Sequence, residues 1–171
     1  MIFKNLEITN YGIFKGQHDL AFAKPSIQSV TLVGGLNGSG KTTIFEAIQI
    51  ALFGAQSNLH KENKLLSYTK YLQSKINRDS DETEGTAIKF SINLLDDIGI
   101  SEDITLIRSW KKTTKGLKEY FEVYRGDIVD IDLSENWIEF ISQIISPSLS
   151  KLFLFDGEKI LHYADPQNTS A

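Results

Sequence analysis

The feature that most constrains this chain is the segment from Gly35 to Thr42, Gly-Leu-Asn-Gly-Ser-Gly-Lys-Thr. It fits the pattern G-x-x-x-x-G-K-[ST], in which a glycine-rich loop joins a strand to a helix and surrounds a phosphate. Before it, residues 30–33 form an apolar run that predicts a buried strand. After it, apolar residues recur at helical spacing: Ile44, Ala47, Ile48, Ala51 and Leu52. This order directs backbone N–H groups and the positive end of the helix dipole at an anion.

Each residue type in this loop has a chemical reason. Glycines let the backbone curl around phosphates without Cβ clashes, Lys41 supplies a compact charge for the β- and γ-phosphates, and the Thr42 hydroxyl is placed to ligate Mg²⁺. A glycine-rich turn that ends in Lys-Thr by chance would not require a strand pattern before it and a helix pattern after it. We therefore predict a nucleoside triphosphate site with Mg²⁺, bound by Gly35, Asn37, Gly38, Ser39, Gly40, Lys41, Thr42 and Thr43.

Size and composition narrow the class of protein. At 171 residues the chain is about one domain. A net charge of −4 argues against a strongly basic nucleic-acid-binding domain, and the absence of cysteine removes disulfides, thiolate zinc sites and cysteine nucleophiles. With no apolar stretch of membrane-spanning length and no visible signal peptide, we expect a cytoplasmic protein without membrane contact.

A basic stretch runs through Arg108, Lys111, Lys112, Lys115 and Lys118. It is interpreted either as a solvated hairpin tip that protects a sheet edge or as a contact for DNA. The histidines, His18, His60 and His162, are too scattered in sequence to predict a metal site.

The remaining chain alternates between strand and helix patterns. Strands are predicted at 2–9 and 18–22 around a turn at 10–12, and an antiparallel meander at about 86–124. Helices are predicted from Thr42 to Phe53, stopped by Gly54, from about 65 to 76, and from a Ser134 cap to Ile145, broken by Pro147. Residues 55–66 are predicted as a surface loop, Trp110 and Trp137 as core, and residues 152–155 as a central buried strand.

Hydrolysis requires a carboxylate near the metal and a group that orients water. The best candidate is Asp156, which follows the apolar residues 152–155. In one interpretation Asp156 is the magnesium-binding acid of a self-contained small P-loop kinase or NTPase, and Glu158 orients water. In the other, residues 155–160 form a switch-like loop that reaches the γ-phosphate, and the magnesium acid lies elsewhere. Asp96-Asp97 is a weaker candidate, and Glu158 is alternatively a helix-start acid.

The order of elements favours the second interpretation. Strands precede the phosphate loop, a strand-rich insertion follows its helix, and no Ser-Gly-Gly signature for capping a sandwiched ATP is present, since the adjacent glycines Gly34 and Gly35 belong to the loop. We expect residues 1–171 to be a single N-terminal lobe of an ATPase head, α/β in class, with a P-loop core sheet flanked by helices and an antiparallel meander. A C-terminal lobe and coiled coil are expected to be absent.

Two segments resemble the N-terminal lobe of SMC-like ATPases such as SbcC and RecF: residues 6–16, LEITNYGIFKG, and residues 32–43, LVGGLNGSGKTT. Within that class, three features resemble DndD, the ATPase of bacterial DNA phosphorothioation (DNA sulfur modification) systems. They are the helix with Tyr68, Tyr71, Leu72 and Ile76-Asn77, the strand 107–110, and the segment 152–160, LFLFDGEKI.

This resemblance implies a head of two lobes joined by a long antiparallel coiled coil. Two such heads, a homodimer, clamp ATP and Mg²⁺ between them, and DNA and other phosphorothioation proteins respond. Hydrolysis then belongs to the completed head, and the fragment alone is expected to be inactive. A non-hydrolysing, ATP-gated dimerisation module is the remaining alternative. In relatives the Asp156 position is a glutamine that senses Mg²⁺ and water, whereas an ionised aspartate cannot donate a hydrogen bond. Lys15 and the turn at 10–14 fall where relatives approach the nucleotide.

If Asp156 belongs to a switch-like loop, Asp156→Asn should leave ATP affinity unchanged and reduce turnover in the assembled head, since the carboxylate then acts on the metal and water rather than on the bound triphosphate. Measuring affinity and turnover on the same preparation separates the two interpretations. Loss of binding would identify Asp156 as a structural or primary metal group.

Overall fold

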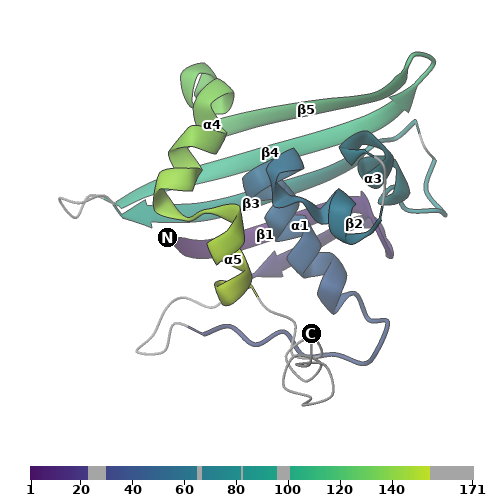
Figure 1. Ribbon diagram of the computed structural model, residues 1–171, viewed down its shortest axis with the longest axis horizontal. Coiled ribbons are helices and arrows are strands. Elements are labelled where there is room, and N and C mark those ends of the chain that lie inside the picture. Colours follow the sequence, from purple (N-terminus) through teal and green to yellow (C-terminus); the bar gives the residue numbers. More distant parts are fainter. Residues whose placement is uncertain (23–29, 65–66, 82, 96–100, 155–171) are drawn as a thin grey trace, which may run out of the picture.

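The computed structural model describes residues 1–22, 30–64, 67–81, 83–95 and 101–154. These residues form two layers, a long antiparallel sheet and a set of helices that lie together on one of its faces (Figure 1). This arrangement confirms the predicted α/β class, and the sheet that the structure describes is antiparallel throughout.

The sheet has six strands in the order β2-β1-β3-β4-β5-β6. Their bounds are β1 Ile2–Tyr11, β2 Phe14–Ala21, β3 Thr86–Leu95, β4 Ser101–Thr113, β5 Gly116–Arg125 and β6 Ile128–Val129. The helices are α1 Lys41–Phe53, the 3-10 helix η1 Gly54–Ser57, α2 Leu59–Glu62, α3 Tyr68–Ser74, α4 Ile131–Ile144 and α5 Pro147–Phe153.

The predicted meander is confirmed as β3, β4 and β5, joined in sequence order. Residues alternate between buried and partly exposed along β3 and β4, as expected when one face of a strand meets the core. Phe90 pairs with Leu106, and Leu106 pairs with Val123, so their buried side chains form one row across the sheet.

Helix α1 is the centre of the core. Its burial extends around most of the helix because the sheet covers one side and the other helices cover the rest (Figure 1). The fully or nearly fully buried apolar residues of α1 are Ala47, Ile48, Ile50, Ala51, Leu52 and Phe53. The helix ends where predicted, at Gly54, which has a φ of 51° and donates its N–H to the Ile50 carbonyl.

Two tryptophans join elements of the core, one between the sheet and a helix and one between two helices. The Trp110 indole N–H of β4 donates to the Leu72 carbonyl of α3 at 3.0 Å, and that of Trp137 in α4 donates to the Leu52 carbonyl of α1 at 2.8 Å. Both rings are 1% exposed, which confirms the prediction that they are core residues. Each ring therefore contributes apolar burial and satisfies its own polar atom.

Helix α4 begins earlier than predicted. Asp130, rather than Ser134, is the N-cap, and its carboxylate accepts a hydrogen bond from the Leu133 N–H at 2.8 Å. Ser134 lies inside the first turn, where its hydroxyl accepts from the Val123 N–H and ties the helix to β5. Both residue types are good caps, and the aspartate one turn upstream takes the role because the serine hydroxyl is engaged by the strand.

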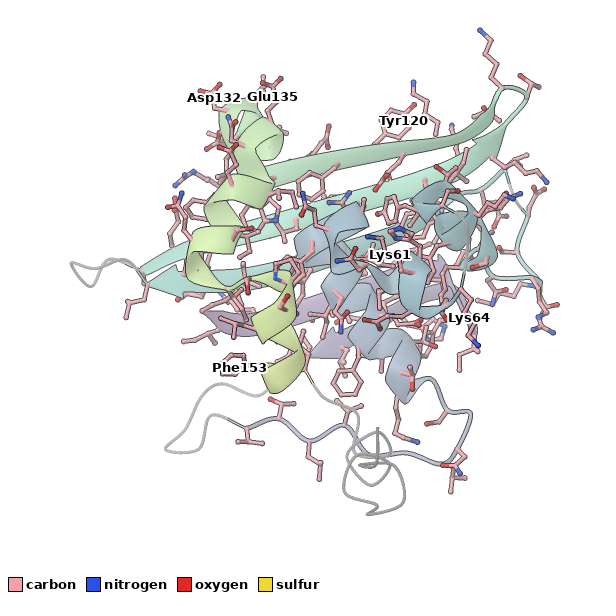
Figure 2. All side chains as sticks on the ribbon, in the orientation of Figure 1. Lys61, Lys64, Tyr120, Asp132, Glu135 and Phe153 are labelled. Carbon is pink, nitrogen blue, oxygen red and sulfur yellow. The ribbon has the colours of Figure 1, made fainter. Side chains whose placement is uncertain are left out.

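Two predicted strands are wrong. Residues 30–36 carry no regular secondary structure, and Val30 and Leu32 are 86% and 91% exposed. Residues up to Phe153 belong to helix α5, which Ser146 caps and Pro147 begins; Phe153 is 72% exposed and extends from the end of that helix (Figure 2). A β-strand requires hydrogen bonds to a neighbouring strand, and within the described residues neither run pairs with one.

Smaller differences between the prediction and the structure concern the boundaries of strands, helices and turns. The first turn falls at residues 12–13, because Asn10 is a bulge within β1 with a φ of 50° and the strand continues to Tyr11. Strand β2 starts at Phe14 rather than His18, helix α3 spans Tyr68–Ser74, and the predicted loop at 55–66 contains η1 and α2.

Trp137→Phe should lower the free energy of unfolding by about 1–3 kcal/mol, since it retains an aromatic ring but leaves the buried Leu52 carbonyl without its donor. Urea denaturation measures the change. Asn136→Ala, which removes a solvent-exposed side chain bond from the same helix, is the matched control and should change stability by less than about 0.5 kcal/mol. Equal effects of both substitutions would contradict the assigned role of the indole.

Candidate nucleotide-binding site

The glycine-rich loop leads directly into α1. Residues 37–38 form a turn closed by a hydrogen bond from the Ser39 N–H to the Leu36 carbonyl at 3.1 Å, and the helix begins at Lys41. The segment that carries the loop runs outside the two layers, beyond the sheet edge formed by β2 (Figure 1). The structure thus confirms the loop and the helix of the predicted arrangement, without the strand before them.

Gly40 cannot be replaced without distortion. Its φ of 96° is unfavourable for residues with a Cβ, and a Cβ placed there would lie 2.6 Å from Cζ of Phe14 and 2.9 Å from Cδ1 of Ile13. The phosphate loop is therefore packed directly against the turn that joins β1 to β2. This contact confirms that the turn at 10–14 lies beside the predicted phosphate loop.

The N-terminus of α1 has the character of an anion site. No side chain of the described residues caps it, and its first turn contains no acidic residue. The first intrahelical bond described there runs from the Ile44 N–H to the Gly40 carbonyl at 3.0 Å. The opening N–H groups of a helix have no intrahelical acceptor, and together with the dipole they attract negative charge.

Lys41 folds back over the loop. Its ammonium donates to the Gly35 and Leu36 carbonyls, each at 3.0 Å, in an exposed setting. Thr42 is exposed, whereas Thr43 is partly buried with its methyl group against Gly12. The predicted cofactor-binding residues 35–43 thus form one continuous unit, with the Lys41 charge next to the helix N-terminus.

The acidic candidates lie outside the described residues. This holds for Asp156 and Glu158, for the whole segment 155–160, and for Asp96 and Asp97. In the part of the chain that the structure describes, no three His, Asp or Glu side chains form a group that could hold a metal ion. Thr42 is the predicted metal ligand whose position is described.

In the structure the basic stretch consists of one buried residue and four surface residues. Arg108 faces inward, 7% exposed, where it pairs with Glu119 at 2.6 Å and lies 4.1 Å from the centroid of the Phe121 ring. It cannot contact DNA in this position. Alternation along β4 explains the difference, because Arg108 shares the core face with its buried neighbours two residues away on each side. The four lysines of the stretch are at the surface: Lys111, Lys112, Lys115 and Lys118.

The sequence pattern did not predict a buried polar cluster that lies beside α1. Glu46 points inward from α1, is 9% exposed and forms an ion pair with Lys75. Beside it lie the buried hydroxyls of Tyr11 and Tyr71, and among the described residues neither has a partner with good hydrogen-bond geometry. A glutamate among the apolar positions 44–52 is the signal that could have pointed to this cluster.

Burial raises the pKa of the buried tyrosine hydroxyls. Loss of solvent is the main cause for Tyr11, Tyr68 and Tyr71 alike, and the neighbouring Glu46 carboxylate further raises the pKa of Tyr11 and Tyr71. A raised pKa in the folded state means that stability is complete below the unfolded value of about 10 and is lost as the pH rises above it.

Tyr11→Phe should therefore make the loss of stability above about pH 10 shallower, by about 1.4 kcal/mol per pH unit, because one group that ionises only on unfolding is removed. Urea denaturation between pH 8 and pH 11 measures the slope. Tyr120→Phe, which alters an exposed ring, serves as the control. A Tyr11→Phe profile that coincides with the wild type would contradict the assignment.

No described helix is both long and apolar enough to cross a membrane.

Residues 5–169 match the AAA domain family. The SbcC component of the SbcCD nuclease of Staphylococcus aureus strain JH9 is 38% identical over 65 residues, which are 37% of this chain and 6% of the relative. The proteins of strains Newman and USA300 match to the same extent, so this chain corresponds to a small part of the length of these relatives. Together these similarities support the N-terminal lobe of an SMC-like ATPase, and the chain belongs to the AAA domain family of P-loop ATPases.

Proposed function

We propose that this chain is the ATP-binding lobe of an SMC-like ATPase, in which residues 35–43 hold the phosphates of ATP with Mg²⁺. The observation that carries the proposal is the N-terminus of α1, which no described side chain caps, directly after a glycine loop whose carbonyls bind the Lys41 ammonium. Backbone donors, dipole and lysine charge all favour an anion at the same point.

The roles follow from the geometry. The Lys41 ammonium, now bonded to loop carbonyls, is placed to exchange them for β- and γ-phosphate oxygens, a stronger charge-assisted contact. The exposed Thr42 hydroxyl would hold Mg²⁺, which when bound neutralises phosphate charge. The methyl group of Thr43 packs against Gly12. Its hydroxyl is proposed to approach the α-phosphate. Asp156 and Glu158 are proposed to act on the metal and the attacking water.

The exposed apolar run before the loop supports a lobe rather than a self-contained enzyme. Val30, Leu32 and Leu36 are each at least 85% exposed, and an apolar segment of this kind is normally covered in a finished fold. We propose that a C-terminal lobe of the same protein covers it, and that two completed heads form a homodimer that clamps ATP.

The process that uses the ATP is proposed from resemblance. The segments similar to DndD favour coupling to DNA phosphorothioation, and the similarity to a component of a nuclease favours DNA processing in general. DNA and other phosphorothioation proteins are the proposed partners, and the cytoplasm is the proposed location.

Lys41→Ala in the full-length protein should weaken ATP binding by about 100-fold and abolish turnover, since it removes the charge that faces the phosphates. The melting temperature should change little, because the Lys41 ammonium donates to exposed carbonyls of its own loop rather than to the buried core. Lys70→Ala, an exposed lysine of α3, is the control. Wild-type affinity in Lys41→Ala would exclude the site.

Measuring ATP turnover by residues 1–171 alone distinguishes the proposed lobe from its alternatives. We expect them to fold without turning over ATP. Turnover that depends on Lys41 would instead identify a self-contained P-loop enzyme, and ATP-dependent dimerisation of the full-length protein without turnover would identify an assembly module.

A further inference from the structure

The turn between β1 and β2 is in direct contact with the phosphate loop at two points. A Cβ at Gly12, whose φ is 59°, would lie 2.6 Å from Cγ2 of Thr43, and a Cβ at Gly40 would lie 2.6 Å from Cζ of Phe14. No side chain fits between turn and loop, so a displacement of the turn displaces the residues that precede and follow Lys41 and Thr42.

This turn is itself held by the segment that follows α3. Asn77 donates its side-chain amide to the Gly12 carbonyl at 2.9 Å and its backbone N–H to the Asn10 carbonyl at 2.9 Å. The Gly12 N–H donates to the Lys75 carbonyl at 2.7 Å. Both backbone polar groups of Gly12 are thus bonded to residues more than 60 positions away in sequence.

The same segment is attached to the helix that carries the phosphate loop. Lys75 forms its ion pair with Glu46 of α1, and both side chains are less than 20% exposed. Asn77 itself is 4% exposed. A closed ring of contacts therefore runs from Thr43 along α1 to Glu46, across to Lys75 and Asn77, and back through Gly12 to Thr43.

We propose that Asn77 is a positioning residue for nucleotide binding. Its amide fixes the β1–β2 turn against the phosphate loop, and it thereby sets the geometry in which Gly40 and Thr43 present the loop to a triphosphate. The hydrogen bonds described for Asn77 reach the turn and its own segment rather than the loop, so it acts through Gly12. This inference rests on the proposed nucleotide site.

Asn77→Asp is the sharpest test, because it keeps the size of the side chain and the oxygen that accepts from the Asp79 N–H at 3.0 Å. It removes the donor to Gly12 and places a carboxylate oxygen at the same position. Asn63→Asp is the matched control, since Asn63 makes the same kind of bond, from its amide to the Leu59 carbonyl at 2.8 Å, at the end of α2.

In the full-length protein with Mg²⁺, Asn77→Asp should raise the KM for ATP about tenfold with kcat nearly unchanged, as expected when one buried hydrogen bond that shapes the site is lost. Asn63→Asp should leave KM unchanged. A purely structural loss would reduce the amount of active protein, and hence the apparent kcat, without raising KM. Asn77→Ala, which introduces no buried charge, is measured in parallel so that misfolding of the aspartate variant does not decide the result.

An unchanged KM in folded Asn77→Asp and Asn77→Ala, with binding lost in Lys41→Ala, would overturn this inference alone. Binding retained in Lys41→Ala would overturn the proposed site and this inference with it.

Discussion

The burial of α1 against the sheet is the interaction on which the rest of this structure depends. The helix carries the phosphate loop at one end and is almost completely enclosed along the remainder, from Glu46 to Phe53. Enclosure of this extent fixes both its axis and its rotation, because close-packed side chains leave no room for adjustment. A loop that begins outside the layers is thereby anchored at its last residue to a helix buried in the core.

Polar groups placed inside this core add directional constraints. Arg108 lies beneath the C-terminal end of α1, its guanidinium about 3.0 Å from where a Cβ of Gly54 would lie, and bonds to Glu119, which also accepts from Tyr68. Glu46 and Lys75 join α1 to the segment after α3. Buried ion pairs contribute little net stability. Their specific geometry does define which face of α1 meets which neighbour, and this is the property that a loop at the helix end requires.

Much of this could be predicted from local pattern. The phosphate loop, the helix stop at Gly54, the three strands of the meander and the core positions of Trp110 and Trp137 all follow from spacing and residue type. Prediction was wrong where the outcome depends on a partner distant in sequence. Residues 30–33 and 152–153 are apolar enough for strands, yet neither run is paired with a strand in the described part of the chain. The hydrogen bond from the Asn77 side chain to the Gly12 carbonyl has no signature in residue spacing, because it joins two segments that are distant in sequence.

The pairing of β1 with β3 has a consequence for how the molecule forms. Ile8 pairs with Ile88, and the phosphate loop lies in sequence between the two strands. Contacts between such distant residues carry a large loop-closure entropy and form slowly compared with local structure. During synthesis on the ribosome the glycine loop therefore emerges after the β1–β2 turn but before Asn77 and β3, and we expect its binding geometry to form only after β3 has been made. Nucleotide competence is thus a late event in the folding of this lobe, although the motif that confers it lies near the start of the chain.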